Sequence, residues 1–197
     1  MSTHLFISAV IGAVVLSGCA GTASFVKTPD DQLILGKTSE AEIRQQRGKP
    51  YQEGVGTKNE KPLKTLSYAY ASAGGEANAL DVTAAKSQNF YIFQDKLAGH
   101  EFVSSWKEDS TDFDETKIAK IQKDVTTRSE VIKIMGPPGG KYGYPLIPGR
   151  EDEALVYAYS HVKGSAANLK RYNKLLVVSF NKQGIVTNVE YTSSGEK

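Results

Sequence analysis

Apolar and polar residues alternate at the period of a β-strand in six short stretches of the chain, arranged in two groups of three. The stretches are 66–71, 89–93 and 101–106 in the first group, and 155–160, 176–180 and 185–191 in the second. Short polar turns separate the last two stretches of each group, and such turns connect antiparallel neighbours. The pattern therefore predicts two three-stranded antiparallel meanders.

A helix-start pattern and a helix-stop pattern precede each group. The start is a capping box, in which a Ser or Thr hydroxyl and a Glu three residues later each accept from a free backbone amide. The stop is a glycine followed by a proline that cannot continue the helix. The residues are Ser39, Glu42, Gly48 and Pro50 in the first copy, and Thr127, Glu130, Gly136 and Pro138, 88 positions further along, in the second.

These elements predict an α+β fold of two tandem units, 32–106 and 115–191, each a helix followed by a three-stranded antiparallel meander. An additional helix is predicted over 115–123, and a short tail, 192–197, ends the chain. The acidic stretch 107–114 is interpreted as a solvated linker that caps this helix. A calcium loop is the alternative, but the stretch lacks the glycine and the terminal glutamate of an EF-hand.

The two predicted helices differ in how much apolar surface they can bury. Positions occupied by Val131, Ile132, Ile134 and Met135 in the second helix correspond to Ile43, Arg44, Gln46 and Arg47 in the first. The first helix is therefore expected to bury little. Either it lies loosely on the sheet, with arginine stems over apolar side chains, or its polar face meets a partner.

An apolar run over 6–16 is followed by Ser17, Gly18 and the chain's only cysteine, Cys19. The run is too short to span a bilayer as a helix and has the length of a signal-peptide core. The arrangement resembles a bacterial lipobox. That resemblance implies cleavage between Gly18 and Cys19, a diacylglycerol on the thiol, and an acyl chain such as palmitate on the new amino group.

The signal peptide is thus predicted over 1–18 and a lipidated tether over 19–31. Ala20 follows the cysteine, and by resemblance to lipoproteins of enteric-type bacteria this implies transfer to the outer membrane, facing the periplasm. The lipid anchor would make the membrane a partner. Against this, 1–4 carries no Lys or Arg, where signal peptides usually do. The alternative is that Cys19 is a small buried apolar residue.

Charge and motif spacing argue against several functional classes. With 24 basic and 22 acidic side chains and no Lys/Arg block, the chain lacks the basic surface of a nucleic-acid partner. His100 and His161 are not spaced with carboxylates or thiols as metal ligands. The loop 136–142 lacks the spacing and hydroxyl of a phosphate loop, and no serine stands in a Gly-x-Ser-x-Gly elbow. We therefore predict a non-enzyme that uses no metal or cofactor.

An ordered set of residues runs through most of the second predicted unit. They are Thr126, Glu130, Val131, Gly136, Pro138, Tyr157, Tyr159, Leu176, Val178, Phe180, Gly184, Ile185 and Val186. In this order they resemble the SmpA/OmlA (BamE-like) family of outer-membrane lipoproteins, and two such units in tandem resemble the β-lactamase-inhibitor-protein fold. The resemblance implies a protein-binding scaffold in cell-envelope or outer-membrane protein assembly. The alternative is a periplasmic inhibitor or ligand-binding lipoprotein.

Large side chains occupy both faces of the predicted meanders: Phe90 points one way and Tyr91 the other. A sheet covered on one side only should alternate apolar with polar residues. The second face therefore either binds an envelope protein partner or is buried between the units or by long loops. Tyrosine and Trp106 suit recognition, because aromatic rings give large contact area. The partner-binding candidates are Tyr68, Tyr70, Tyr91, Tyr157 and Tyr159, and those that prove buried belong to the core.

Overall fold

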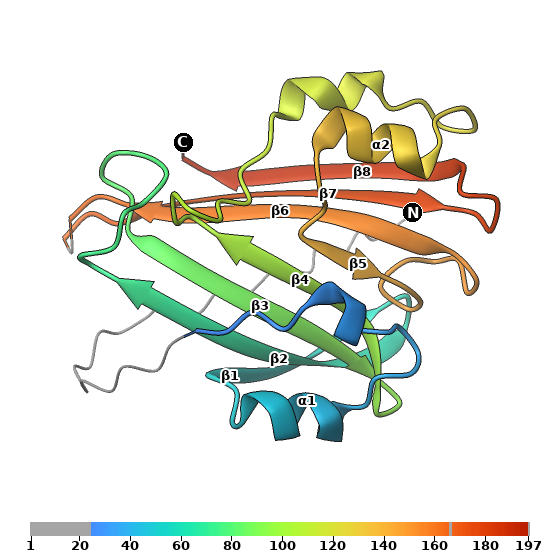
Figure 1. The fold of residues 1–197 in the computed structure, drawn as a ribbon, viewed down its shortest axis with the longest axis horizontal. Coiled ribbons are helices and arrows are strands. Elements are labelled where there is room, and N and C mark those ends of the chain that lie inside the picture. The colour runs from blue at the N-terminus through green and yellow to red at the C-terminus, as the bar shows by residue number, and fades with distance from the viewer. Residues whose placement is uncertain (1–24, 166, 197) are drawn as a thin grey trace.

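The computed structural model describes residues 25–165 and 167–196, which form one antiparallel sheet of eight strands. The strands lie in the sheet in chain order, so each pairs with the next (Figure 1). They are β1 (Gln52–Lys58), β2 (Lys61–Ser72), β3 (Ala84–Phe93), β4 (Lys96–Ser104), β5 (Gly140–Tyr142), β6 (Glu153–Lys163), β7 (Lys170–Phe180) and β8 (Val186–Gly195). The α-helices are α1 (Glu40–Arg47) and α2 (Arg128–Met135), and the 3-10 turns are η1 (Asp30–Gln32) and η2 (Glu115–Lys120).

The predicted fold class of two helix-plus-three-strand units is wrong, because the strands form one continuous sheet. β4 pairs with β5, with Gly99 opposite Tyr142 and Glu101 opposite Gly140, and four strands follow each α-helix. The six predicted stretches all overlap strands, and the two missed strands are β1 and β5. β1 contains two glycines and is exposed along most of its length, and β5 has only three residues. Neither can produce apolar alternation.

The two α-helices begin and end as the sequence predicts. Ser39 and Thr127 supply the cap hydroxyls, and both capping boxes are complete. Gly48 and Gly136 follow the last helical residues with φ of 72° and 88°. Because glycine adopts positive φ without steric cost, these two positions end the helices.

α1 is better anchored than predicted. Its Ile43 is 1% exposed and packs in a cluster with Leu66 and Phe90. The Arg47 guanidinium lies 4.9 Å from the ring centres of both Phe25 and Tyr68. Of the two alternatives for this helix, the structure favours an arginine laid over aromatic side chains.

The predicted helix over 115–123 is instead the shorter 3-10 turn η2. The amide of Ile121 donates to the carbonyl of Ile118 and closes the turn, and the Ile121 side chain is buried. Asp124 then adopts a φ of 62°, a conformation that cannot continue a right-handed helix. Val125, expected on the helical stripe, is 63% exposed.

The acidic stretch 107–114 lies against the sheet. The hydroxyl of Thr111 donates to the carbonyl of Ala158 at 2.7 Å, and the side chain of Phe113 is 8% exposed. The Asp114 carboxylate accepts from the Thr116 amide at the start of η2. This segment therefore contributes to the core as well as joining elements.

Both faces of the sheet are buried over much of their area. On one, the helix face, Val131 of α2 packs with Tyr157 and Leu176, and Ile43 of α1 packs in a second cluster. On the opposite face, Leu146 and Ile147 cover strand residues. The loop that connects β5 with β6 thus buries this face, which was one of the alternatives open at the sequence level.

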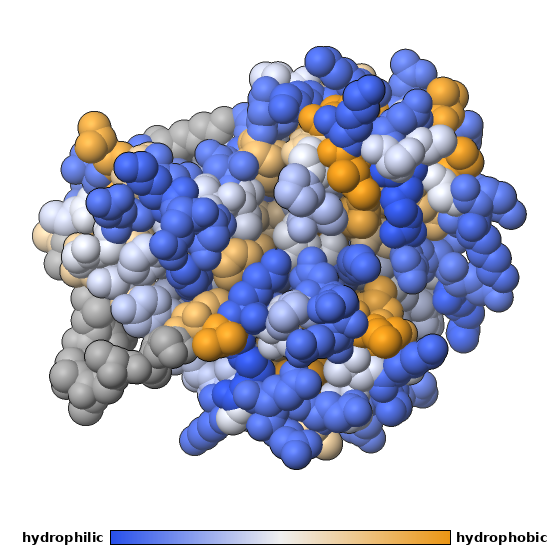
Figure 2. Space-filling model, viewed as in Figure 1, coloured by the Kyte–Doolittle hydropathy of each residue, from blue (hydrophilic) through white to orange (hydrophobic). Residues whose placement is uncertain are grey.

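The surface seen in the view of Figure 1 is mostly polar. Figure 2 shows apolar residues only in small, separate areas among polar side chains. Within residues 25–165 and 167–196, no helix has both the length and the apolar character needed to span a membrane.

Candidate protein-binding surface

The five candidate tyrosines do not share one surface. Four are buried, with exposed fractions of 3–8%: Tyr68, Tyr91, Tyr157 and Tyr159. Tyr70 is 40% exposed. The four buried residues belong to the core, so only Tyr70 is in a position to contact a partner.

Tyr68 and Tyr157 hold the ends of the α-helices against the sheet. The hydroxyl of Tyr68 donates to the carbonyl of Gly48 at 2.9 Å, and that of Tyr157 to the carbonyl of Gly136 at 3.0 Å. Burial raises the pKa of Tyr157 to about 12, and burial also raises the pKa of Tyr68. Both hydroxyls therefore stay protonated and act as hydrogen-bond donors.

Tyr91 belongs to a buried polar cluster on the opposite face. Its hydroxyl donates to Glu101 at 3.0 Å, the amide of Asn89 donates to the same oxygen at 3.1 Å, and the Tyr142 hydroxyl contacts the other carboxylate oxygen. Burial and the nearby Glu101 charge raise the pKa of both tyrosines well above the usual value. Glu101 is 3% exposed, so its three donors make this a satisfied structural cluster.

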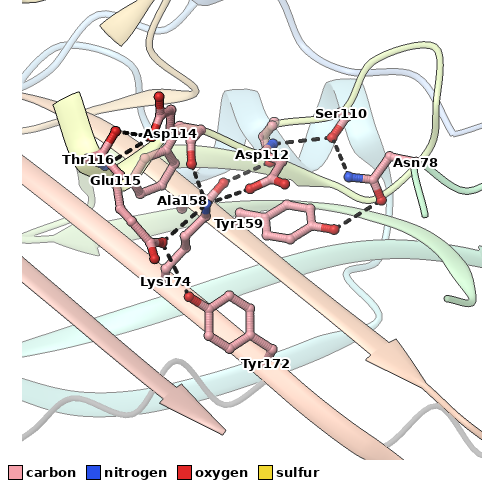
Figure 3. Close-up of polar contacts among 12 residues, drawn as sticks. Asn78, Ser110, Asp112, Asp114, Glu115, Thr116, Ala158, Tyr159, Tyr172 and Lys174 are labelled. Carbon is pink, nitrogen blue, oxygen red and sulfur yellow. Dashed lines mark hydrogen bonds and ion pairs between the residues drawn. The ribbon is translucent and has the colours of Figure 1, made fainter. Parts of the chain in front are cut away.

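Lys174 of β7 fixes the acidic stretch to the helix face, as Figure 3 shows. Its amino group lies 2.6 Å from Asp112 and 3.6 Å from Glu115, and it contacts the carbonyl of Phe113. The same group lies 4.4 Å from the centre of the Phe113 ring. A lysine that is 7% exposed needs such partners, because burying an unpaired charge is costly.

Tyr159 joins the same region to the loop between β2 and β3. Its hydroxyl donates to Asn78 at 3.0 Å, and the Asn78 amide donates to the Ser110 hydroxyl at 2.9 Å (Figure 3). This chain of hydrogen bonds links three segments far apart in the sequence. Tyr159 therefore has a structural role.

The exposed Tyr70 forms a surface with Trp106. The register of β2, β3 and β4 places Tyr70 opposite Lys86, and Lys86 opposite Ser104, two residues before Trp106. The rings of Tyr70 and Trp106 are stacked, with centres 5.9 Å apart and planes at 17°. We call these two rings, Lys86 and the adjoining pocket the Tyr70–Trp106 surface.

Lys86 supports the indole from one side. Its amino group lies 5.0 Å from the Trp106 ring centre, 2.8 Å from Asp109 and 3.1 Å from Glu108. The pKa of Lys86 is raised overall: burial acts to lower it, but the hydrogen bonds and charges of Asp109 and Glu108 outweigh that effect. The residue is a permanent cation against the indole face.

A pocket of about 550 Å³ adjoins the indole. Its lining residues are Ser72, Gly74, Gly75, Glu76, Trp106, Lys107 and Glu108. A Cβ atom at Gly75 would lie 2.5 Å from the Trp106 ring, so only glycine lets the loop approach the indole this closely. The Lys107 amide donates to the Glu76 carbonyl at 2.9 Å and holds the loop beside the strand end.

The described residues hold no group of three His, Cys, Asp or Glu side chains that could bind a metal. His100 is fully buried, and the His161 ring contacts the rings of Tyr159 and Tyr172, each with centres 5.5 Å apart. The predicted lipidation and cleavage positions, Cys19 and Gly18, lie outside the described residues.

Sequence reasoning identified both rings of this surface, but it missed Lys86 and the pocket loop. Tyr70 and Lys86 are 16 positions apart in the sequence, and the pairing of β2 with β3 that brings them opposite each other is not contained in a local pattern. The adjacent glycines Gly74 and Gly75 were the available signal for a close approach of the backbone.

No protein-family model matches the chain, and no curated protein matches it. Among solved structures, a Streptococcus mutans protein described as a proposed beta-lactamase inhibitor protein is similar. The two sequences are 10% identical, the match covers 83% of this chain and 91% of the other chain, and the TM-score is 0.41. A likeness at that TM-score carries no argument about function. The resemblance to the SmpA/OmlA family stays a prediction.

Proposed function

We propose that this chain is a non-enzymatic lipoprotein of the outer membrane, facing the periplasm, that binds a protein partner through the Tyr70–Trp106 surface. Its role would be that of a scaffold in cell-envelope or outer-membrane protein assembly. The lipobox-like sequence ending at Cys19 supports the anchor. The order of residues that resembles the SmpA/OmlA family supports the cellular role.

The observation that carries the binding proposal is the stack of the exposed Tyr70 on the half-buried Trp106, beside a pocket. Stacked aromatic rings offer rigid apolar area, and tyrosine, tryptophan and pockets are enriched where protein interfaces gain most of their affinity. Tyr70 is 40% exposed, and the ring contact described for it is the stack on Trp106. The four buried tyrosines, by contrast, are explained by hydrogen bonds inside the protein.

Affinity capture from detergent-solubilised envelopes tests the binding proposal. Tyr70→Ala is expected to reduce capture of the partner by tenfold or more, since truncating a hot-spot residue costs about 2 kcal/mol or more. The matched control is Tyr191→Ala, because Tyr191 is 37% exposed and lies on the far edge strand β8. Equal capture by both variants and the wild type would contradict the proposed surface. Capture of a single soluble enzyme would favour the inhibitor alternative.

Cell fractionation tests the anchor separately. Cys19→Ser is expected to move the protein from the outer membrane to the soluble fraction, because a hydroxyl cannot enter the thioether chemistry of lipidation. If the Cys19→Ser protein stays with the outer membrane after a high-salt wash, the lipoprotein proposal is wrong.

A further inference from the structure

Residues 25–32, which we call the strap, cross the helix face of the sheet between α1 and α2 (Figure 1). Two hydrogen bonds hold the middle of the strap. The Thr28 amide donates to the side-chain oxygen of Gln88 at 2.8 Å, and the side-chain amide of Gln88 donates to the Thr28 carbonyl at 3.0 Å. The Phe25 ring lies 6.1 Å from the Phe102 ring. Gln88 and Phe102 are opposite each other in β3 and β4, so the strap is fixed to one place on the sheet.

His100 of β4 is buried beside this contact. It pairs with Phe90, the next residue of β3 on the same face after Gln88. The His100 side chain is fully buried, and neither of its ring nitrogens has a hydrogen-bond partner among the described residues. A neutral imidazole has one donor and one acceptor. The closed structure therefore buries both of these groups unpaired, which costs free energy.

The charges that act on His100 come from the strap and from β5. Asp30 of the strap attracts a proton to the ring, whereas Lys27 of the strap and Lys141 of β5 repel one. β3 places the uncharged Phe90 opposite the ring. Burial is the largest effect, and it lowers the pKa of His100 from 6.5 to about 4 in spite of Asp30. The closed strap therefore disfavours the protonated ring.

The strap is held by few buried contacts. Among residues 25–32, only Thr28 is buried. The Phe25 ring covers the Arg47 guanidinium at 4.9 Å, and one nitrogen of this group is buried with no hydrogen-bond partner among the described residues. The chain is fixed again at Gly36, whose amide donates to the Leu97 carbonyl at 2.8 Å. Segments with few buried contacts open locally at a lower cost than global unfolding.

We propose that protonation of His100 releases the strap from the sheet while α1 and the strands stay folded. In the released state the ring nitrogens reach water, so the charged ring is no longer buried. The open state binds a proton that the closed state excludes, and release is therefore favoured as the pH falls from 6.5 towards 4. The ratio of open to closed protein is expected to rise about 25-fold between pH 7.5 and pH 5.

Release of the strap lengthens the membrane tether, a consequence that rests on the lipid proposed at Cys19. The strap lies between that residue and α1. An extended chain spans at most about 3.3–3.6 Å per residue, so freeing residues 25–32 adds roughly 25 Å of reach. The Tyr70–Trp106 surface then reaches partners further from the membrane when the medium is acidic.

Thiol labelling of the full chain tests the release, in a Cys19→Ser background that removes both the native thiol and the lipid. Failure of the anchor proposal therefore does not affect this experiment. Thr28→Cys places a thiol at a position that is 5% exposed, and Val26→Cys places one on the same strap at a position that is 66% exposed. Dividing the first labelling rate by the second, with dithiodipyridine as the reagent, cancels the effect of pH on thiol reactivity. This ratio is expected to rise about 25-fold from pH 7.5 to pH 5.

Two controls separate strap release from other causes. Adding His100→Leu should keep the ratio within about twofold, because the titrating group is gone. Ser179→Cys, at a position of β7 that is 5% exposed, reports global unfolding. It should label at least about tenfold more slowly than Thr28→Cys at pH 5, since local opening costs less than unfolding.

Three results would overturn the proposal. One is a ratio that stays constant or falls at pH 5, as it would if the protonated ring paired with Asp30 and tightened the strap. Another is an equal rise in the ratio when His100→Leu is present. The third is equal labelling of Thr28→Cys and Ser179→Cys, which would mean that the strap opens only when the whole protein unfolds.

Discussion

The hydroxyl of Tyr157 donates a hydrogen bond of 3.0 Å to the backbone carbonyl of Gly136, the residue that ends α2. Tyr68 makes the same contact with Gly48 at the end of α1. Carbonyls at a helix end lack partners within the helix. In both places a strand residue supplies the missing donor and ties the helix end to the sheet.

Tyr157→Phe and Tyr68→Phe are each expected to lower the free energy of unfolding by about 0.5–1.5 kcal/mol, the range for one hydrogen bond. Urea unfolding followed by circular dichroism measures the change. Tyr70→Phe is the control, because the Tyr70 side chain is exposed. A loss from Tyr70→Phe as large as from Tyr157→Phe would contradict the assigned role of the hydroxyls.

Ile43→Ala is expected to destabilise the protein by about 2–5 kcal/mol, because it removes buried methyl groups and leaves a cavity. Ile43 is 1% exposed beneath α1. Gln46→Ala, on the exposed side of the same helix, should change stability by less than about 0.5 kcal/mol. Urea unfolding distinguishes them, and a small effect of Ile43→Ala would mean that α1 is only loosely attached.

Lys174→Met should destabilise the fold by about 1–3 kcal/mol, since it leaves the Phe113 carbonyl without its donor. The matched control is Lys182→Met. Lys182 pairs with Glu151 at 2.7 Å, but the two side chains are 62% and 71% exposed, and such pairs contribute about 0–1 kcal/mol. Thermal unfolding at low and high salt measures the change in melting temperature for each of the two variants. Similar shifts for the two lysines would show that the buried cluster contributes no more than a surface pair.

His100 is expected to make stability depend on pH. Burial, opposed by the charge of Asp30 and helped by the charges of Lys141 and Lys27, lowers its pKa from 6.5 to about 4. Between these values the unfolded chain binds a proton that the folded protein does not. Stability should therefore fall by roughly 3 kcal/mol as the pH drops from above 6.5 to 4.

His100→Leu removes the titrating group and should flatten this part of the pH profile. Both ring nitrogens of His100 are buried with no hydrogen-bond partner among the described residues, so an apolar side chain of similar size leaves no donor or acceptor unsatisfied. Urea midpoints at pH 7 and pH 4.5 supply the test. If the stability of His100→Leu falls between pH 7 and pH 4.5 as much as that of the wild type, other groups cause the pH dependence.

Sequence alone determined where the two α-helices begin and end. The capping boxes at Ser39 and Thr127 and the stops at Gly48 and Gly136 are all present, because each signal lies within a few residues and acts on its own backbone. The six alternating stretches also form strands. The extent of the sheet was not predictable in this way, since β1 and β5 owe their strand conformation to their neighbours.

The tertiary structure decided which aromatic residues are available. Tyr68 and Tyr70 stand two positions apart on the same face of β2, yet one is 6% and the other 40% exposed. α1 and Arg47 cover Tyr68, whereas Tyr70 lies beyond the helix, beside Trp106. Burial depends on what packs over a side chain from distant parts of the chain, and periodicity records only the face of the strand to which the side chain belongs.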